Sequence, residues 1–216
     1  MDKQKILHTK VYWTIVIVYI ISTLSIGIYQ LSISGIGVAW KAFVGMLFLL
    51  IPLILRKLFK FKASDKIDEV LFIFIFIAYM TGVVLKLYHY ILWYDIAMHF
   101  ACGFLFFEIG LCVWFYLKGS NNLSFTHDAL LSGAFSFCFV QLISLAWELI
   151  EYSGFVFFGY DSQHMDTGVV DTMDDIFICL IGSMLMALIW YLRAKGKKVF
   201  LFLPSEEFYK NNFKNQ

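Results

Sequence analysis

The feature that most constrains this chain is a series of six long apolar segments separated by short polar connections. They lie at about residues 11–29, 36–55, 69–88, 95–117, 129–152 and 171–192. A helix needs about 20 mostly apolar residues to cross roughly 30 Å of hydrocarbon. Because backbone polar groups in lipid must be satisfied within a segment, the sequence predicts an all-α, polytopic membrane protein, a bundle of six transmembrane helices.

The composition excludes the main alternatives to a membrane protein. Hydrophobic residues make up 61% of the 216-residue chain and charged residues 15%, against about 45–50% and about 25% in a typical soluble domain. Runs such as residues 70–85 are continuously apolar rather than alternating, which excludes an outer-membrane barrel. The four cysteines show no CxxC spacing, so we expect small core residues rather than a zinc or redox site.

The basic residues predict the orientation of the bundle. Three precede the first segment, five lie between the second and third, one lies between the fourth and fifth, and six follow the sixth. Only Lys41 and Lys86 fall on the other side, so the positive-inside rule predicts that both termini are cytoplasmic. We expect one transmembrane domain over residues 1–198 and a frayed cytoplasmic tail over 199–216, with Val199–Leu203 resting on the inner leaflet as the alternative.

Acidic residues and one histidine gather at the predicted outer ends of the last three segments. Neighbours at i, i+3 or i, i+4 share a helix face, and each segment carries such a pair. Several carboxylates without a basic neighbour repel one another, so we predict a divalent-cation site. Its predicted ligands are Asp95, His99, Glu148, Asp171 and Asp175. Carboxylates favour Mg, Mn or Ca, and the imidazole of His99 admits Zn and Fe.

A structural acidic network is the alternative interpretation of the same residues. Acids at the start of a helix are stabilised by the helix dipole, which applies to Asp95, Asp171, Asp174 and Asp175. The dipole disfavours anions at the end of a helix, where Glu148 and Glu151 lie, so these two need another partner. Both interpretations stay open at the level of the sequence.

Further polar residues continue inward from this outer cluster. Cys138, Gln141, Ser144, Glu148 and Glu151 recur at three- and four-residue steps on the fifth segment. Gln141 and Ser144, with Asp166 and Asp174, are our candidates for a substrate pocket, although hydrogen bonding between helices explains the first two equally well.

An acid and two glycines within the fourth and sixth segments lie outside the acidic cluster. Glu108 lies nine residues after His99 and faces the other way, so we expect it to be protonated or paired outside the cluster. Gly103 and Gly182 have no side chain, so they let neighbouring helices approach closely.

Three motifs carry a family resemblance. Tyr94–Gly103 resembles the YDxxxHFxxG pattern of YjdF-type bacterial inner-membrane proteins. Glu148–Tyr152 is similar to their ELIEW segment, and Asp171–Asp175, followed by Gly182, to their WDxxxDM and downstream glycine. The order D-x-x-x-H, Glu, D-x-x-x-D also resembles VanZ-like proteins more loosely. The resemblance to YjdF-type proteins implies a multi-pass protein of the bacterial inner membrane but no particular reaction. The likeness to VanZ-like proteins alone suggests a role in the cell envelope or with lipid-linked molecules.

The chain departs from the YjdF-type pattern near the sixth segment. Val170 stands where that family has tryptophan, and Asp174 has no counterpart there. The acid that precedes the tryptophan in the family corresponds to Asp166 here.

The preferred functional prediction is a metal-dependent envelope enzyme acting on the head group of a membrane lipid or lipid-linked precursor. The cation would polarise a phosphoryl oxygen or activate water, His99 would be both ligand and catalytic residue, and Glu151 would be the general base.

Two alternatives differ in class. A small transporter or substrate-capturing subunit would use the Gln141 stripe and Glu108 as a route, completed by a homo-oligomer or a partner membrane subunit. An accessory protein would use the acidic network only to hold helices together. Nothing in the sequence supports nucleic-acid binding, because the basic connections are short and the positive-inside rule already accounts for their position.

Overall fold

The computed structural model describes residues 8–118, 128–159, 168–197, 199 and 201–214. Within these ranges the regular structure is helical and no strand is present. Six helices are long and apolar enough to cross a membrane, which confirms the predicted fold class. They cover Lys10–Ser34, Ile36–Phe59, Asp65–Val84, Tyr94–Lys118, Ala129–Phe158 and Val169–Ala194.

Two of these spans are made of more than one helical type. The first span is α1 (Lys10–Ser34), and the second joins α2 (Ile36–Gly45), a 3-10 turn, η1 (Met46–Leu50), and α3 (Ile51–Phe59). The third joins α4 (Asp65–Ile75) to the π-helical η2 (Phe76–Val84). The remaining elements are α5 (Leu87–Tyr90), α6 (Tyr94–Lys118), α7 (Ala129–Phe158), α8 (Val169–Ala194), α9 (Leu203–Tyr209) and η3 (Lys210–Lys214).

The span ends differ from the predicted ones where backbone conformation decides them. The helix α1 continues to Ser34 and stops at Gly35, whose φ of 69° belongs to the left-handed region that glycine tolerates. The third span covers residues 65–84 rather than 69–88, and it ends early because Lys86 takes a left-handed conformation with a φ of 62°.

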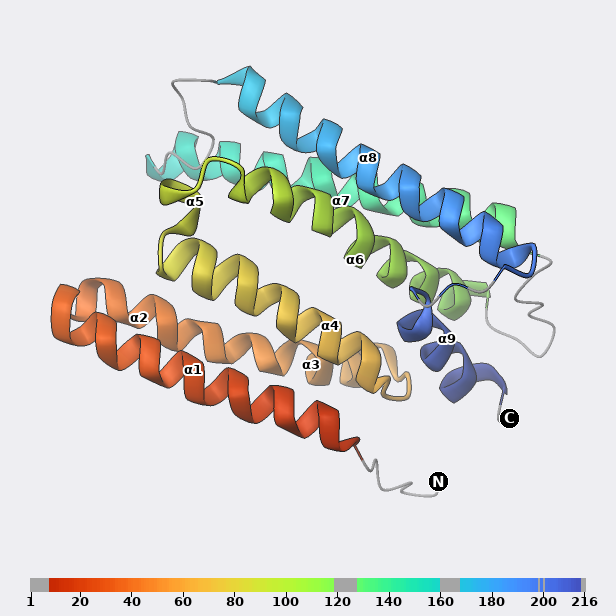
Figure 1. Cartoon of the computed structure of the whole chain (residues 1–216), viewed down its shortest axis with the longest axis horizontal. Helices are drawn as coiled ribbons and strands as arrows, with labels where there is room; N and C mark the ends of the chain where they lie inside the picture. Colours follow the sequence, from red (N-terminus) through yellow and green to blue (C-terminus); the bar gives the residue numbers. More distant parts are fainter. Residues whose placement is uncertain (1–7, 119–127, 160–167, 198, 200, 215–216) are drawn as a thin grey trace. The chain divides into compact units, whose positions relative to one another are not determined.

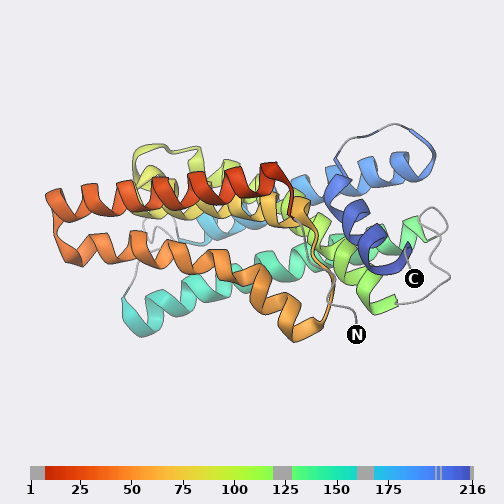
Figure 2. The ribbon, with the colours of Figure 1, turned by 90° about the horizontal axis from the view of Figure 1, so that it is seen from below.

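The contacts divide the chain into two compact units. The first unit comprises residues 1–92 and 206–216, and the second comprises residues 93–205. In the second unit α6, α7 and α8 lie side by side in both views (Figures 1 and 2). In the first unit α1 packs against α2 and α4. The single transmembrane domain over residues 1–198 stays a prediction.

The helices α6 and α8 cross in direct backbone contact at two glycines. A Cβ atom added to Gly182 would lie 2.6 Å from the carbonyl oxygen of Phe100. One added to Gly103 would lie 2.8 Å from the backbone nitrogen of Ser183. The close approach predicted for Gly103 and Gly182 is therefore confirmed, and it fixes how α6 and α8 face each other.

The predicted frayed tail is wrong in both units. In the second unit, Phe202 is fully buried and packs edge-to-face on Trp190 with ring centroids 4.9 Å apart. The backbone N–H of Ser205 donates to Glu108 Oε2 at 3.1 Å. Glu108, the intramembrane carboxyl predicted to be protonated or paired, is therefore a hydrogen-bond acceptor for the tail. The tail is ordered because its apolar and polar groups find tertiary partners that sequence periodicity does not reveal.

In the first unit, the C-terminal segment binds the connection before α4. Glu207 Oε2 accepts hydrogen bonds from Ser64 Oγ at 2.8 Å and from the backbone N–H of Lys66 at 2.9 Å. Asn212 bonds both backbone groups of Lys62. Ser64 is the N-cap residue of α4, but its side chain does not cap the helix. Glu207 instead accepts from a backbone N–H in the first turn of α4.

The cysteines only partly match their predicted place in the core. Cys112 and Cys179 are buried and Cys102 is half-buried, but Cys138 is exposed. The prediction was wrong for Cys138 because α7 turns this position outward, away from Val140 and Ser144.

Candidate metal site

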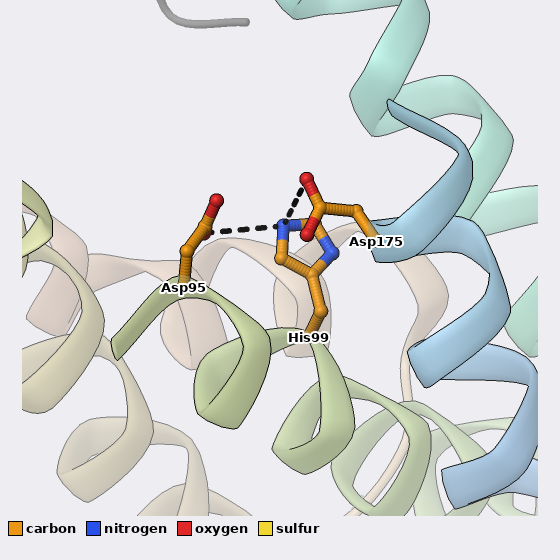
Figure 3. Close-up of side chains that lie close together, drawn as sticks. All are labelled: Asp95, His99 and Asp175. Atoms are coloured by element: carbon orange, nitrogen blue, oxygen red, sulfur yellow. Dashed lines mark ion pairs between the residues drawn. The ribbon is translucent and has the colours of Figure 1, made fainter. Parts of the chain in front are cut away.

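Asp95, His99 and Asp175 converge between α6 and α8 (Figure 3). His99 Nε2 lies 3.4 Å from Asp95 Oδ1 and 3.7 Å from Asp175 Oδ2. One ligand atom from each of the three residues lies within 4.8 Å of the other two. We call these three residues the carboxylate–histidine cluster.

Helix geometry places these side chains. Asp95 and His99 are one turn apart on the same face near the start of α6. Asp175 points from α8 toward the imidazole (Figure 3). His99 precedes Gly103 by four residues and Asp175 precedes Gly182 by seven, so the glycine crossing brings the two side chains close.

The cluster is buried on its inner side and partly open on the other. His99 is 7% exposed and Asp175 is 3% exposed, whereas the side chain of Asp95 is 29% exposed. Two carboxylates in such surroundings need a positive partner, because little water screens their repulsion.

The spacing suits a divalent cation. Neighbouring ligand atoms bound at about 2.1 Å to one tetrahedral or octahedral cation lie about 3.0–3.4 Å apart. The two distances from His99 Nε2, 3.4 and 3.7 Å, would have to shrink only slightly to reach this range. Three protein ligands leave further coordination positions for water or substrate, as in catalytic metal sites. The same spacing also suits a protonated His99 held between two carboxylates.

Two other predicted ligands lie around the cluster rather than in it. Glu148 on α7 is 3% exposed, lies beside Thr172 and interacts electrostatically with Asp95 and His99. Asp171 interacts electrostatically with Glu148 and Asp175. Neither Glu148 nor Asp171 belongs to the group of ligand atoms that lie within 4.8 Å of one another in the described residues.

Glu151, the predicted general base, lies on α7 beside Trp147. Its Oε1 accepts a hydrogen bond from Trp147 Nε1 at 3.0 Å. Its charge acts on Glu148 and on all three members of the carboxylate–histidine cluster. The carboxylate is therefore near the cluster but is oriented by the indole of Trp147.

The four residues predicted to line a substrate pocket differ in burial and in their partners. Gln141 Nε2 donates to Ser183 Oγ at 2.9 Å, which joins α7 to α8. Ser144 is buried next to Cys179, and Asp174 is exposed. Asp166 lies outside the described residues. Gln141 thus takes part in hydrogen bonding between helices, which the sequence had left as an alternative.

Three residues near the cluster were not predicted to belong to a site: Thr172, Cys102 and Cys179. Cys102 and Cys179 lie about one turn deeper than His99 and Asp175 along their helices and are near each other. Their spacing of three and four residues from His99 and Asp175 is the signal that could have indicated them. Thr172 has no comparable signal.

A family model matches most of the chain. The model of a family described as a predicted membrane protein, DUF2238, matches residues 11–196. No curated protein and no solved structure matches the chain. Nothing in these comparisons bears on the likeness to VanZ-like proteins. The matched range contains all six spans except the first residue of α1, and it includes the carboxylate–histidine cluster. The chain belongs to the DUF2238 family of predicted membrane proteins.

Proposed function

We propose that this membrane protein binds a divalent cation at Asp95, His99 and Asp175 and uses it to act on the polar head group of a membrane lipid or lipid-linked molecule. One observation carries the proposal: two carboxylates and an imidazole from two different helices offer ligand atoms within 4.8 Å of one another. The glycine crossing of α6 and α8 holds this arrangement in place.

The balance of charge supports a cation rather than histidine alone. Five carboxylates interact with one another in this region, those of Asp95, Glu148, Glu151, Asp171 and Asp175. A protonated His99 supplies one positive charge, whereas a divalent cation bound to the neutral imidazole supplies two in a region where charges are poorly screened. Glu148 and Asp171 would then be outer ligands or would orient bound water.

A lipid substrate suits the surroundings of the cluster. On α7 the residues next to Glu148 and Glu151 are exposed and apolar, including Trp147, Leu149 and Ile150. A substrate whose chains stay in the bilayer could bring its head group to the cluster without leaving the lipid. The cation would polarise a phosphoryl oxygen there while water attacks the phosphorus and the P–O bond to the leaving alcohol breaks. Glu151 would accept the proton of the attacking water and pass it to the leaving oxygen.

The resemblance and the distribution of basic residues support a location. We assign the protein to the YjdF-type group and to the bacterial inner membrane, with both termini in the cytoplasm and the cluster on the outer face. Only a transport role would require a homo-oligomer or a partner membrane subunit. The bond from Ser205 to Glu108 gives that carboxyl a structural partner, so no specific observation favours transport.

A structural network is the second candidate, and the distances favour it equally. His99 Nε2 is within ion-pair range of both Asp95 and Asp175. A protonated imidazole could join α6 to α8 with no metal ion. Measuring bound metal separates these two candidates.

Metal analysis of the purified protein is the test. After loading with Mn²⁺ or Zn²⁺ and removal of excess, we expect about one ion per chain in the wild type. Asp95→Asn and Asp175→Asn should lose most of it, and Glu148→Gln should retain a reduced amount, whereas Asp174→Asn, a matched control on an exposed acid next to Asp175, should bind like wild type. Equal metal content in all variants, or none in the wild type, would contradict the cation site.

The lipid part of the proposal has its own test. Phosphorus NMR of vesicles that contain the loaded protein should show a change of head-group signals that requires the cation and is lost in Glu151→Gln. Metal binding without such a change would keep the cation site and reject the proposed substrate.

A further inference from the structure

We propose that three exposed lysines at the end of the second span, Lys57, Lys60 and Lys62, bind the head groups of anionic phospholipids. We call these three residues the lysine rim. The proposal concerns the first unit and does not depend on the cation site. It goes beyond the orientation argued from positive charges, because it assigns a ligand to particular side chains.

The position of the lysine rim puts it at the surface of the bilayer. The second span ends at Phe59, and Lys60 is the left-handed residue that closes α3, its N–H donating to the carbonyl of Arg56 at 2.8 Å. Between the lysines, Leu58 is 67% exposed and Phe59 is 45% exposed. Exposed apolar side chains at the end of a span lie in lipid, so neighbouring lysines extend toward the head groups.

The backbone beneath the lysine rim is held in place. Asn212 accepts a hydrogen bond from the Lys62 N–H at 2.6 Å and donates one to its carbonyl at 3.3 Å. The ring of Phe61 packs on that of Phe208 at 5.4 Å. The Lys62 side chain remains exposed, so the contacts fix the segment without using its charge.

The acidic side chains of this region are already engaged with other partners. Asp65 accepts from His8 and from the Thr9 backbone, Asp68 pairs with Arg56, Glu69 accepts from the Thr9 hydroxyl, and Glu207 accepts from Ser64 and the Lys66 backbone. Among the described residues, no ion pair involves any member of the lysine rim. Within the part of the chain that the structure describes, these three positive charges therefore have no ion-pair partner and lie beside exposed apolar groups at the end of a span.

This combination favours a lipid over a soluble anion. A lysine near a membrane contributes roughly 1 kcal/mol of attraction to an anionic surface, which corresponds to about fivefold in binding. Three lysines would give about a hundredfold preference for an anionic over a zwitterionic lipid. Solvated lysines with no ligand would give no such preference, and that difference can be measured.

The experiment uses the full-length protein in detergent with added lipid, monitored by native mass spectrometry. We expect the wild type to retain phosphatidylglycerol in strong preference to phosphatidylcholine of the same chain length. Each Lys→Gln change in the lysine rim should lower this preference about fivefold. The triple variant should lose it, and Lys41→Gln with Lys86→Gln, which change lysines outside the rim, should leave it unchanged.

Three results would overturn the proposal: no preference in the wild type, a full preference in the triple variant, or displacement of phosphatidylglycerol by millimolar inorganic phosphate. The last would indicate a soluble anion site. If the triple Gln variant does not fold, the triple Lys→Arg variant keeps the charge and should keep the preference. The single variants then carry the test, and an unchanged preference in all three would reject it.

Discussion

Replacing Gly182 by alanine should weaken cation binding without touching any ligand. The added methyl group would lie 2.6 Å from the carbonyl oxygen of Phe100, and ordinary contact begins at 3.4 Å. Neither atom can move by a side-chain rotation, because the carbonyl oxygen belongs to the backbone of α6 and the Cβ atom is bonded directly to the backbone of α8. The helices α6 and α8 must therefore separate by about 0.8 Å at their crossing.

That separation acts directly on the carboxylate–histidine cluster. His99 Nε2 and Asp175 Oδ2 are 3.7 Å apart, and a rigid shift would take them to about 4.5 Å. Two neighbouring ligands of one cation must approach to about 3.0–3.4 Å. To bind the cation, α6 and α8 would therefore have to come together again and force the new methyl group against the carbonyl oxygen of Phe100. Overpacking of this kind costs about 1–3 kcal/mol, and we expect the cation affinity to fall by about 10- to 100-fold.

Isothermal titration of the detergent-solubilised protein with Mn²⁺ measures the change. The matched control is Gly154→Ala on α7, where an added Cβ atom meets nothing within 4 Å; it should bind like the wild type. If Gly182→Ala also bound Mn²⁺ with wild-type affinity while remaining folded, the crossing would not position the site and our reasoning would be refuted.

Three further predictions concern stability. Glu207→Gln replaces the carboxylate that accepts from Ser64 and the Lys66 backbone, so it should lower the free energy of unfolding by about 1–3 kcal/mol; an unchanged thermal midpoint would show that this contact contributes nothing. Trp190→Phe removes the indole N–H that bonds the first turn of α7 and should lower stability by about 1–2 kcal/mol, seen in denaturant unfolding; a stabilised variant would contradict this. Adding a chelator to the Mn²⁺-loaded wild type should lower its unfolding temperature, since ligand at 100 times its Kd stabilises by about 2.7 kcal/mol, and the effect should vanish in Asp175→Asn; an equal shift in both would place the stabilising ion elsewhere.

The spans could be predicted from the sequence because bilayer thickness sets their length. Their ends could not, since these depend on single backbone conformations. The end of α1 is set by Gly35 and that of the third span by the left-handed backbone of Lys86. The order of the tail depends on partners distant in the sequence, such as Trp190 for Phe202. No periodicity in residues 199–216 indicates those contacts.

For the candidate site, the sequence could predict pairs on one helix but not distances between helices. Asp95 and His99 share a face by their spacing, and the structure puts them 3.4 Å apart. Asp175 joins them and Asp171 does not, although both were predicted on the same face of one helix. Asp171 lies one helical turn before Asp175. The position of α8 along α6, which backbone contact at Gly182 fixes, therefore decides this difference.

Spin-echo EPR of the Mn²⁺-loaded protein tests the central claim most directly. A cation bound by the imidazole of His99 should show modulation from one directly coordinated ¹⁴N nucleus, and His99→Gln should lose that modulation while Asp95 and Asp175 still retain some Mn²⁺. Bound Mn²⁺ without ¹⁴N modulation, or with the same modulation in His99→Gln, would show that the cluster does not hold the cation as we propose.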